Sequence, residues 1–367
     1  MAGTFRQLAL VAAGVTTQAE DSDHTLVISS KLISSHSGGL PMTLSVEMTP
    51  PPFDPELGAA LPAITEMIPA ALTADLIPAL RSGAPLGAPT DDDLRRDGKF
   101  TLEERTVPGL GGDPDISLLI LRPTAATGTL GCVYFTHGGG MILGDNRTGV
   151  LEALDWAEEF GLVVVSVEYR LAPETPHPGP INDCYAGLTW TADHADELGY
   201  EPGRLIVAGG SAGGGLAAAL ALMARDKGGP ALAGQMLIYP MLDDRNDTYS
   251  SRQMAGRGIW DSTANDTGWT ALLGAARGGP DVSPYAAPAR ETDLSNLPPA
   301  FIDVGSVETF RDEDVAYANR IWQAGGRAEL HVWPGAFHGF DATVPQAGIS
   351  QEARAARVRW LHRLLDV

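Results

Sequence analysis

Short apolar runs rich in β-branched and aromatic residues recur from about residue 100 onward, and stretches of helical periodicity separate most of them. The apolar runs predict eight strands, at 100–108, 116–122, 131–137, 162–168, 204–209, 235–240, 300–305 and 328–333. The helical stretches cover 149–160, 183–198, 213–227, 312–324 and 350–365. Strands that alternate with helices form a mostly parallel sheet with helices on both faces. The pattern therefore predicts the α/β fold class.

The stretch before residue 100 has a helical pattern of its own. Leucine and isoleucine residues recur at spacings of three and four over 55–83. Pro62, Pro69 and Pro78 interrupt this pattern, and because proline disrupts the interior of a helix, we expect several short helices there. Glycine, proline and aspartate residues over 83–93 indicate a loop.

The chain divides into two predicted parts. Alternating apolar residues within 25–34 and 40–48 favour a β-hairpin. Together with the short helices, this hairpin belongs to a predicted N-terminal extension and cap over 1–95, and the main α/β domain follows over 96–367. The stretch 243–297 has no strand candidate, so we expect a helical insertion that contributes to the cap and to a pocket.

The chain is strongly acidic. It carries 46 Asp and Glu residues against 25 Lys and Arg residues, which gives a formal net charge of −21. Such a surface repels phosphate backbones and anionic lipid head groups, so we expect neither a nucleic acid nor a membrane as a partner. No run of about 18 apolar residues is present, and the sequence therefore predicts no transmembrane helix.

Two cysteines, Cys132 and Cys184, are too few for a disulfide framework and lack the spacing of a metal site. We expect free thiols in a reducing compartment and no bound metal. A short apolar stretch after Arg6 leaves a signal peptide over 1–19 as an alternative. Its basic segment is thin and its apolar segment is short, so the expected location is the cytoplasm.

The strongest local motif surrounds a serine. The run Gly209-Gly210-Ser211-Ala212-Gly213 follows a predicted strand and precedes a helix-forming run, which is the context of a G-x-S-x-G nucleophile elbow. A strand that turns abruptly into a helix strains the serine and tolerates only small neighbours. The Ser211 hydroxyl then lies at a helix N-terminus, where backbone N–H groups favour developing negative charge. A glycine-rich turn without catalytic function is the alternative.

A second glycine run follows an earlier predicted strand. In His137-Gly138-Gly139-Gly140, successive glycines let backbone N–H groups face a substrate without intervening side chains. Esterases carry an HGGG-type oxyanion loop at this position. We assign the oxyanion donors to the N–H groups of Gly138, Gly139 and Ala212, and we interpret His137 as a residue that orients the loop.

A serine nucleophile needs a base and an acid. His338 lies on a loop after the last predicted strand, where hydrolases with the chain order Ser, acid, His place the base. The acid that holds the imidazole must lie between Ser211 and His338. Asp303 lies inside a strand, Asp312 lies where a helix begins and could cap it, and Glu308 falls on the loop between them. These residues leave three candidates for the acid.

Six motifs together resemble the bacterial hormone-sensitive lipase family (family IV) of esterases. They are HGGG at 137–140, EYRLAPE at 168–174, GGSAG at 209–213, LPPA at 297–300, ETFRDE at 308–313 and FHGF at 337–340. The resemblance extends from about residue 100 to the end of the chain. It implies an α/β-hydrolase fold with an eight-stranded, mostly parallel sheet and an N-terminal helical cap.

The resemblance also bears on the acid. The family's acid opens a D-P-L-x-D-E stretch, and alignment of 311–313 with its end places Glu308 at the acid position, with Asp312 and Asp303 as alternatives. Gly210 departs from the family, whose members commonly carry Asp or Thr there. In the EYRLAPE stretch, Arg170 and Glu174 are expected in buried ion pairs, and so is Asp183.

The expected function is that of a serine carboxylesterase that hydrolyses short- to medium-chain esters through an acyl-enzyme. Ser211, His338 and Glu308 form the expected catalytic triad, and no cofactor is implied. Alternatives are a long-chain lipase, an amidase, a peptidase, or a non-catalytic ligand receptor on the same fold. The expected partner is a small-molecule ester. Because family members often dimerise through the last strand, here 328–333, we also expect a homodimer, which would cover that exposed edge.

Overall fold

The computed structural model describes residues 48–69, 71–82, 89–125 and 130–366. The alternative of a signal peptide over 1–19 and most of the predicted β-hairpin concern residues outside these ranges. The described chain from residue 48 onward forms one compact unit. The domain boundary at residue 95 stays a prediction.

All eight predicted strands form and belong to one sheet. They are β1 (Phe100–Val107), β2 (Ile116–Pro123), β3 (Gly131–Thr136), β4 (Leu162–Glu168), β5 (Leu205–Gly210), β6 (Gly234–Ile238), β7 (Ala300–Gly305) and β8 (Ala328–Trp333). Their order across the sheet is β1-β2-β4-β3-β5-β6-β7-β8. The strands β1, β2 and β4 pair antiparallel, and all other neighbours pair parallel. This confirms the predicted mostly parallel sheet of eight strands.

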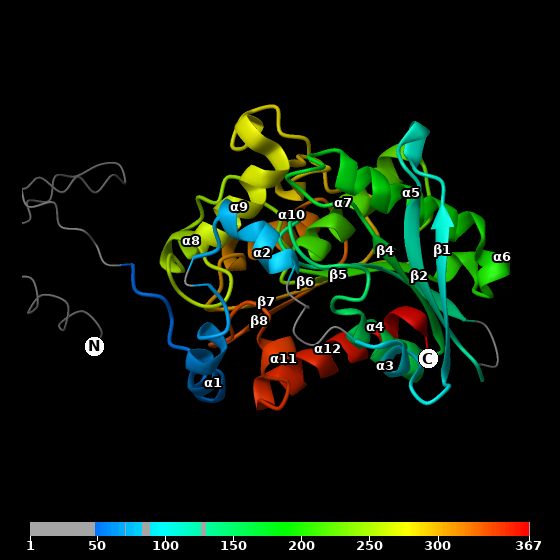
Figure 1. Ribbon diagram of the computed structural model, residues 1–367, viewed down its shortest axis with the longest axis horizontal. Helices are drawn as coiled ribbons and strands as arrows, with labels where there is room; N and C mark the ends of the chain where they lie inside the picture. The colour runs from blue at the N-terminus through cyan, green and yellow to red at the C-terminus, as the bar shows by residue number, and fades with distance from the viewer. Residues whose placement is uncertain (1–47, 70, 83–88, 126–129, 367) are drawn as a thin grey trace, which may run out of the picture. The chain divides into compact units, whose positions relative to one another are not determined.

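Helices cover both faces of the sheet (Figure 1). On one face, α4 (Val150–Phe160) packs on β3 and β4, and α12 (Gly348–Leu365) packs on β7. On the other, α5 (Gly179–Asp193) and α7 (Ala212–Lys227) pack on the central strands, and α10 (Arg311–Gln323) packs on β7 and β8. Strand β4 is buried except at its last residue, as its apolar sequence requires.

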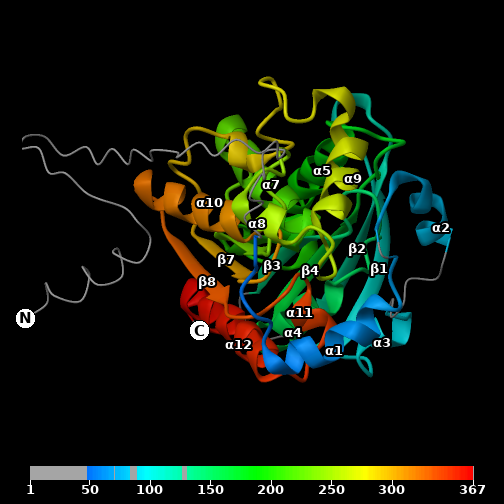
Figure 2. The same ribbon diagram turned by 90° about the vertical axis from the view of Figure 1, so that its left-hand side faces the viewer.

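The short helices before the sheet are α1 (Pro55–Thr65), α2 (Ile77–Ser82) and α3 (Asp91–Arg95). Helix α1 lies beside α11 (Phe340–Thr343) in both views (Figure 1, Figure 2). The backbone N–H of Asp54 donates to the carbonyl of Gly335 at 3.0 Å, which joins the start of α1 to the loop after β8. The cap is thereby attached close to the end of the sheet that carries the candidate triad.

The prediction of several short helices over 55–83 is confirmed, but two details of this region were wrong. Pro62 lies inside α1 and does not end it; the helix continues to Thr65. The predicted loop over 83–93 contains the start of α3, because Thr90 and Asp93 form a capping box in which the side chain of each accepts a backbone N–H of the other. The acidic residues that indicated a loop are those that start the helix.

The stretch 243–297 contains α8 (Tyr249–Gln253), α9 (Ser262–Leu273) and two 3-10 turns, and no strand. The hydroxyl of Thr267 on α9 donates to the carbonyl of Leu72 at 2.7 Å, so this helical stretch contacts the cap directly. The remaining short helix, α6 (Ala195–Leu198), follows α5. No helix in the described ranges is long and apolar enough to cross a membrane.

Candidate active site

Ser211 occupies the sharp turn between β5 and α7. Its backbone has φ +60° and ψ −124°, a left-handed conformation that non-glycine residues rarely adopt. A Cβ atom at Gly213 would lie 2.0 Å from the carbonyl oxygen of Thr136, and one at Gly209 would lie 2.6 Å from the same oxygen. Glycine is therefore required at both positions, and the motif forms the strained turn that presents the Ser211 hydroxyl.

The imidazole of His338 lies between the hydroxyl of Ser211 and the carboxylate of Glu308. Its Nε2 is 2.9 Å from Oγ of Ser211, and its Nδ1 is 2.5 Å from Oε1 of Glu308. The other carboxylate oxygen of Glu308 accepts the backbone N–H of Gly305 at 3.2 Å. Ser211 and His338 are each 8% exposed, and Glu308 is 1% exposed. The three side chains follow β5, β8 and β7, whose carboxyl ends meet at one edge of the sheet.

The two alternative acids are bound elsewhere. Asp303 accepts hydrogen bonds from Arg357 and Trp333 within the core. Asp312 accepts the backbone N–H of Ser250 at 2.7 Å and pairs with the neighbouring Arg311. Asp312 is also not a helix cap, because α10 begins at Arg311 with Phe310 at the cap position. The structure thus brings Glu308 to His338 and places the other two carboxylates in structural contacts.

Aromatic rings surround the imidazole of His338. Tyr239 and Phe310 contact it edge-on, with ring centroids 4.8 Å and 5.2 Å away. The hydroxyl of Tyr239 donates to Asp341 at 3.1 Å, and Asp341 pairs with the buried Arg357. Packing on several sides leaves the imidazole little freedom to rotate away from Ser211.

The glycine run approaches the nucleophile. A Cβ atom at Gly138 would lie 3.0 Å from the carbonyl oxygen of Gly210 and 3.5 Å from Cβ of Ser211. Gly139 has φ +112°, and a Cβ there would lie 2.1 Å from the carbonyl oxygen of Leu143. A side chain is excluded at Gly139 and would be crowded at Gly138, so backbone borders the Ser211 side chain on this side.

His137 is buried behind this loop. Its Nδ1 donates to the carbonyl of Gly138 at 2.8 Å, and its ring stacks on Tyr169 at a centroid distance of 4.0 Å. The Tyr169 hydroxyl donates to the His137 carbonyl at 2.8 Å. Burial lowers the pKa of His137 to about 4, so the ring is neutral at pH 7. These contacts fix the conformation of the loop, in keeping with the interpretation of His137 as an orienting residue.

The EYRLAPE stretch matches its expectation in part. The guanidinium of Arg170 bonds both oxygens of the fully buried Asp183, at 2.8 Å and 2.6 Å. The expectation of a buried pair at Glu174 was wrong, because its side chain is 65% exposed and pairs with Arg81 of α2 at 2.8 Å. Glu174 therefore lies on a surface turn, where Arg81 of the cap forms an ion pair with it.

Sequence reasoning missed Arg81. Its guanidinium also donates to the carbonyls of Ile142 and Ala172, so one side chain joins the cap to the loop after the glycine run and to the EYRLAPE turn. No motif marks Arg81. The only sequence signal is the glutamate of EYRLAPE, for which an ion pair, and hence a basic partner, was expected.

A cavity of about 860 Å³ lies between the cap and the helical stretch 243–297. Its walls are largely apolar, with Leu61, Ile68 and Leu72 from the cap and Ile259 and Trp260 from the other side. Leu143, close after the glycine run, also lines it. The cavity therefore adjoins the elements that carry the candidate triad and is a suitable place for an apolar part of a substrate.

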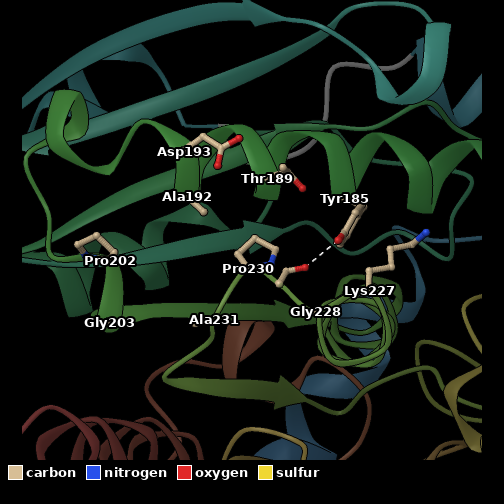
Figure 3. A pocket seen from close by; sticks show the side chains of 11 residues that line it. Tyr185, Thr189, Ala192, Asp193, Pro202, Gly203, Lys227, Gly228, Pro230 and Ala231 are labelled. Carbon is tan, nitrogen blue, oxygen red and sulfur yellow. Dashed lines mark hydrogen bonds between the residues drawn. The ribbon is translucent and has the colours of Figure 1, made fainter.

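A second cavity, of about 460 Å³, lies beside α5 and the end of α7 (Figure 3). It is lined by segments that precede β5 and β6, so it lies at the amino ends of these strands, away from Ser211. The Tyr185 hydroxyl donates to the carbonyl of Gly229 at 2.7 Å, and the ammonium of Lys227 lies over the Tyr185 ring. Its polar groups contact one another and no catalytic arrangement is present among them.

Neither cysteine belongs to the candidate site. Cys132 and Cys184 are buried free thiols, and burial raises the pKa of each. Across the described residues, no group of three His, Cys, Asp or Glu side chains is placed to hold a metal ion.

Known proteins resemble this chain closely. A family model described as the α/β-hydrolase fold matches residues 133–342. Carboxylesterase NlhH of Mycobacterium tuberculosis is 38% identical over 273 residues, which cover 72% of this chain and 84% of that protein. Esterase LipI of the same organism is 37% identical over 234 residues, or 62% and 70% of the two chains. A solved bacterial heroin esterase has a TM-score of 0.75 and 38% identity, covering 85% of this chain and 98% of its own.

These matches agree with the six motifs and with the strand order. The chain belongs to the hormone-sensitive lipase family of esterases within the α/β-hydrolase fold.

Proposed function

We propose that this protein is a serine carboxylesterase that hydrolyses short- to medium-chain carboxylic esters through an acyl-enzyme. The single observation that carries the proposal is the hydrogen-bonded series from Ser211 to His338 to Glu308, with distances of 2.9 Å and 2.5 Å. The carboxylesterase and esterase names of the relatives support the reaction class.

In the proposed reaction, Oγ of Ser211 attacks the ester carbonyl while Nε2 of His338 takes the hydroxyl proton. The imidazolium that forms is stabilised by the Glu308 carboxylate at Nδ1. The protonated His338 then gives its proton to the leaving alkoxide, and the alcohol departs. Water attacks the acyl-enzyme by the same route in reverse, which releases the acid and restores Ser211.

The oxyanion of each tetrahedral intermediate is assigned to the backbone N–H groups of Gly138, Gly139 and Ala212. Ala212 is the first residue of α7, where unpaired N–H groups carry partial positive charge. Fixed amides in a site shielded from water stabilise developing charge without having to reorganise during the reaction. Removal of one such donor typically costs about 10² to 10³ in kcat.

Ser211→Ala tests the proposal directly. We expect this variant to lose at least about 10³-fold in kcat towards p-nitrophenyl acetate, since triad members act as a unit. It should also fail to react with a fluorophosphonate that labels the wild-type protein at one residue. Retention of near wild-type hydrolysis by a folded Ser211→Ala variant would rule the proposal out.

We further propose that the protein is located in the cytoplasm, in keeping with its two buried free thiols.

We also propose that the protein forms a homodimer through β8. Strand β8 is an edge of the sheet, and Val332 on it is 40% exposed. Trp322 and Val315 of the neighbouring helix α10 are 46% and 37% exposed. An unpaired edge flanked by exposed apolar side chains is a surface that a second copy can cover.

A further inference from the structure

The cavity under the cap and the candidate triad have one aromatic neighbour in common, Trp260. Of the described residues that line this cavity, none is Ser211, His338 or a member of the glycine run 138–140. Trp260 lines the cavity and also contacts the triad region. Trp260 therefore lies at the side of the cavity that faces the candidate triad.

The indole ring packs against the oxyanion loop. A Cβ atom at Gly140 would lie 2.2 Å from Cη2 and 2.6 Å from Cζ2 of Trp260. The indole centroid is 6.3 Å from that of His338. Trp260 is 8% exposed, so protein surrounds it on nearly all sides. The ring therefore borders both the oxyanion loop, next to the carbonyl of an acyl group on Ser211, and the imidazole of His338.

The backbone of Trp260 is anchored beside the triad acid. The hydroxyl of Thr309, which directly follows Glu308, donates to the Trp260 carbonyl at 2.7 Å. The indole Nε1 has only a long contact of 3.5 Å with Asn265. The ring is thus held in place by packing, and a smaller side chain at this position leaves space without breaking a strong hydrogen bond.

We propose that Trp260 is the residue that limits acyl-chain length, by closing the passage from Ser211 to the apolar cavity. This inference rests on the proposed esterase function. Short acyl groups react on the triad side of the indole, and longer ones collide with it. Removal of the ring joins the two spaces, and each methylene that then becomes buried contributes up to about fourfold to binding.

The test compares Trp260→Ala with the wild-type protein on p-nitrophenyl acetate, butyrate and octanoate. We expect the ratio of kcat/KM for octanoate to that for acetate to rise at least about tenfold in the variant. Trp190→Ala is the matched control, because Trp190 lies on α5 against His194 and Arg105 and lines neither the cavity nor the triad. The control should change the ratio by less than about twofold.

An unchanged ratio in a folded, active Trp260→Ala protein would overturn the role of Trp260 and leave the esterase proposal intact. A wild-type protein that hydrolyses none of the three esters would instead overturn the esterase proposal. If Trp260→Ala does not fold, Trp260→Leu and Trp260→Phe decide the same question, with a larger ratio expected for the smaller leucine. Inactivation rates with methyl and octyl fluorophosphonates give a second measure that does not depend on deacylation.

Discussion

At the scale of single residues, the proposed triad acid is a glutamate where the resemblance to the family leads us to expect an aspartate. Glu308 has one more methylene than aspartate, and its second oxygen accepts the backbone N–H of Gly305. That bond restricts the carboxylate that contacts His338. The proposed role therefore does not require the shorter side chain.

Glu308→Gln should lower kcat by about 10² to 10⁴, because the amide cannot stabilise the imidazolium and favours the wrong tautomer. Steady-state kinetics on a short-chain ester measure the loss. Asp312→Asn is the matched control, and its kcat should stay within about threefold of wild type, because Asp312 contacts Ser250 and Arg311 instead of His338. The reverse pattern, with a large loss only in Asp312→Asn, would refute the assignment.

A functional residue could be predicted from the sequence where its chemistry requires particular residue types next to it in the chain. Ser211 needs glycines on both sides, and this leaves a motif. Arg81 leaves none, since an arginine can reach three carbonyl or carboxylate groups from many positions on a helix. Trp260 was visible only as one aromatic residue in a strand-free stretch, because its role depends on a cavity that distant segments form together.

At the scale of elements, α10 carries a buried acid. Asp314 is fully buried, and neither of its carboxyl oxygens has a hydrogen-bond partner among the described residues. Burial, together with the nearby Glu313 and Glu308, raises its pKa well above the usual value. Helix α10 therefore buries a carboxyl group whose neutral form is favoured over its charged form.

This acid makes stability depend on pH in a defined direction. Well below pH 3.8, Asp314 is protonated in both the folded and the unfolded chain. At higher pH only the unfolded chain releases the proton, so the free energy of unfolding falls by up to about 1.4 kcal/mol per pH unit. Asp314→Asn removes this dependence, and its advantage over wild type should grow from pH 5 to pH 8 in denaturant titrations.

The eight strands were predictable because buried parallel strands appear in a sequence as short apolar runs between glycine-rich turns. The helices of the cap were harder to predict. The start of α3 depends on Thr90 and Asp93 exchanging hydrogen bonds, and an acidic run resembles a loop until that capping is recognised. Likewise, Pro62 is tolerated inside α1, where only packing around the helix decides the outcome.

At the scale of the whole molecule, the proposed dimer can be tested at the edge strand β8. We expect a dimer mass in light scattering coupled to size exclusion, and a shift to monomer in Val332→Asp. A charged side chain on an exposed edge disfavours strand pairing, and a protein with a net charge of −21 repels added negative charge between copies. A monomer mass for the wild-type protein at micromolar concentration would contradict the proposed dimer.

The Arg81 contacts have a consequence for how the cap is held. Because this one guanidinium donates to the carbonyls of Ile142 and Ala172 and pairs with Glu174, any movement of α2 away from these segments breaks three contacts at once. The backbone N–H of Ile142 in turn donates to the carbonyl of Gly139 at 3.0 Å, so the cap and the glycine run are joined through one residue. A substitution at Arg81 therefore loosens the cap and the glycine run together.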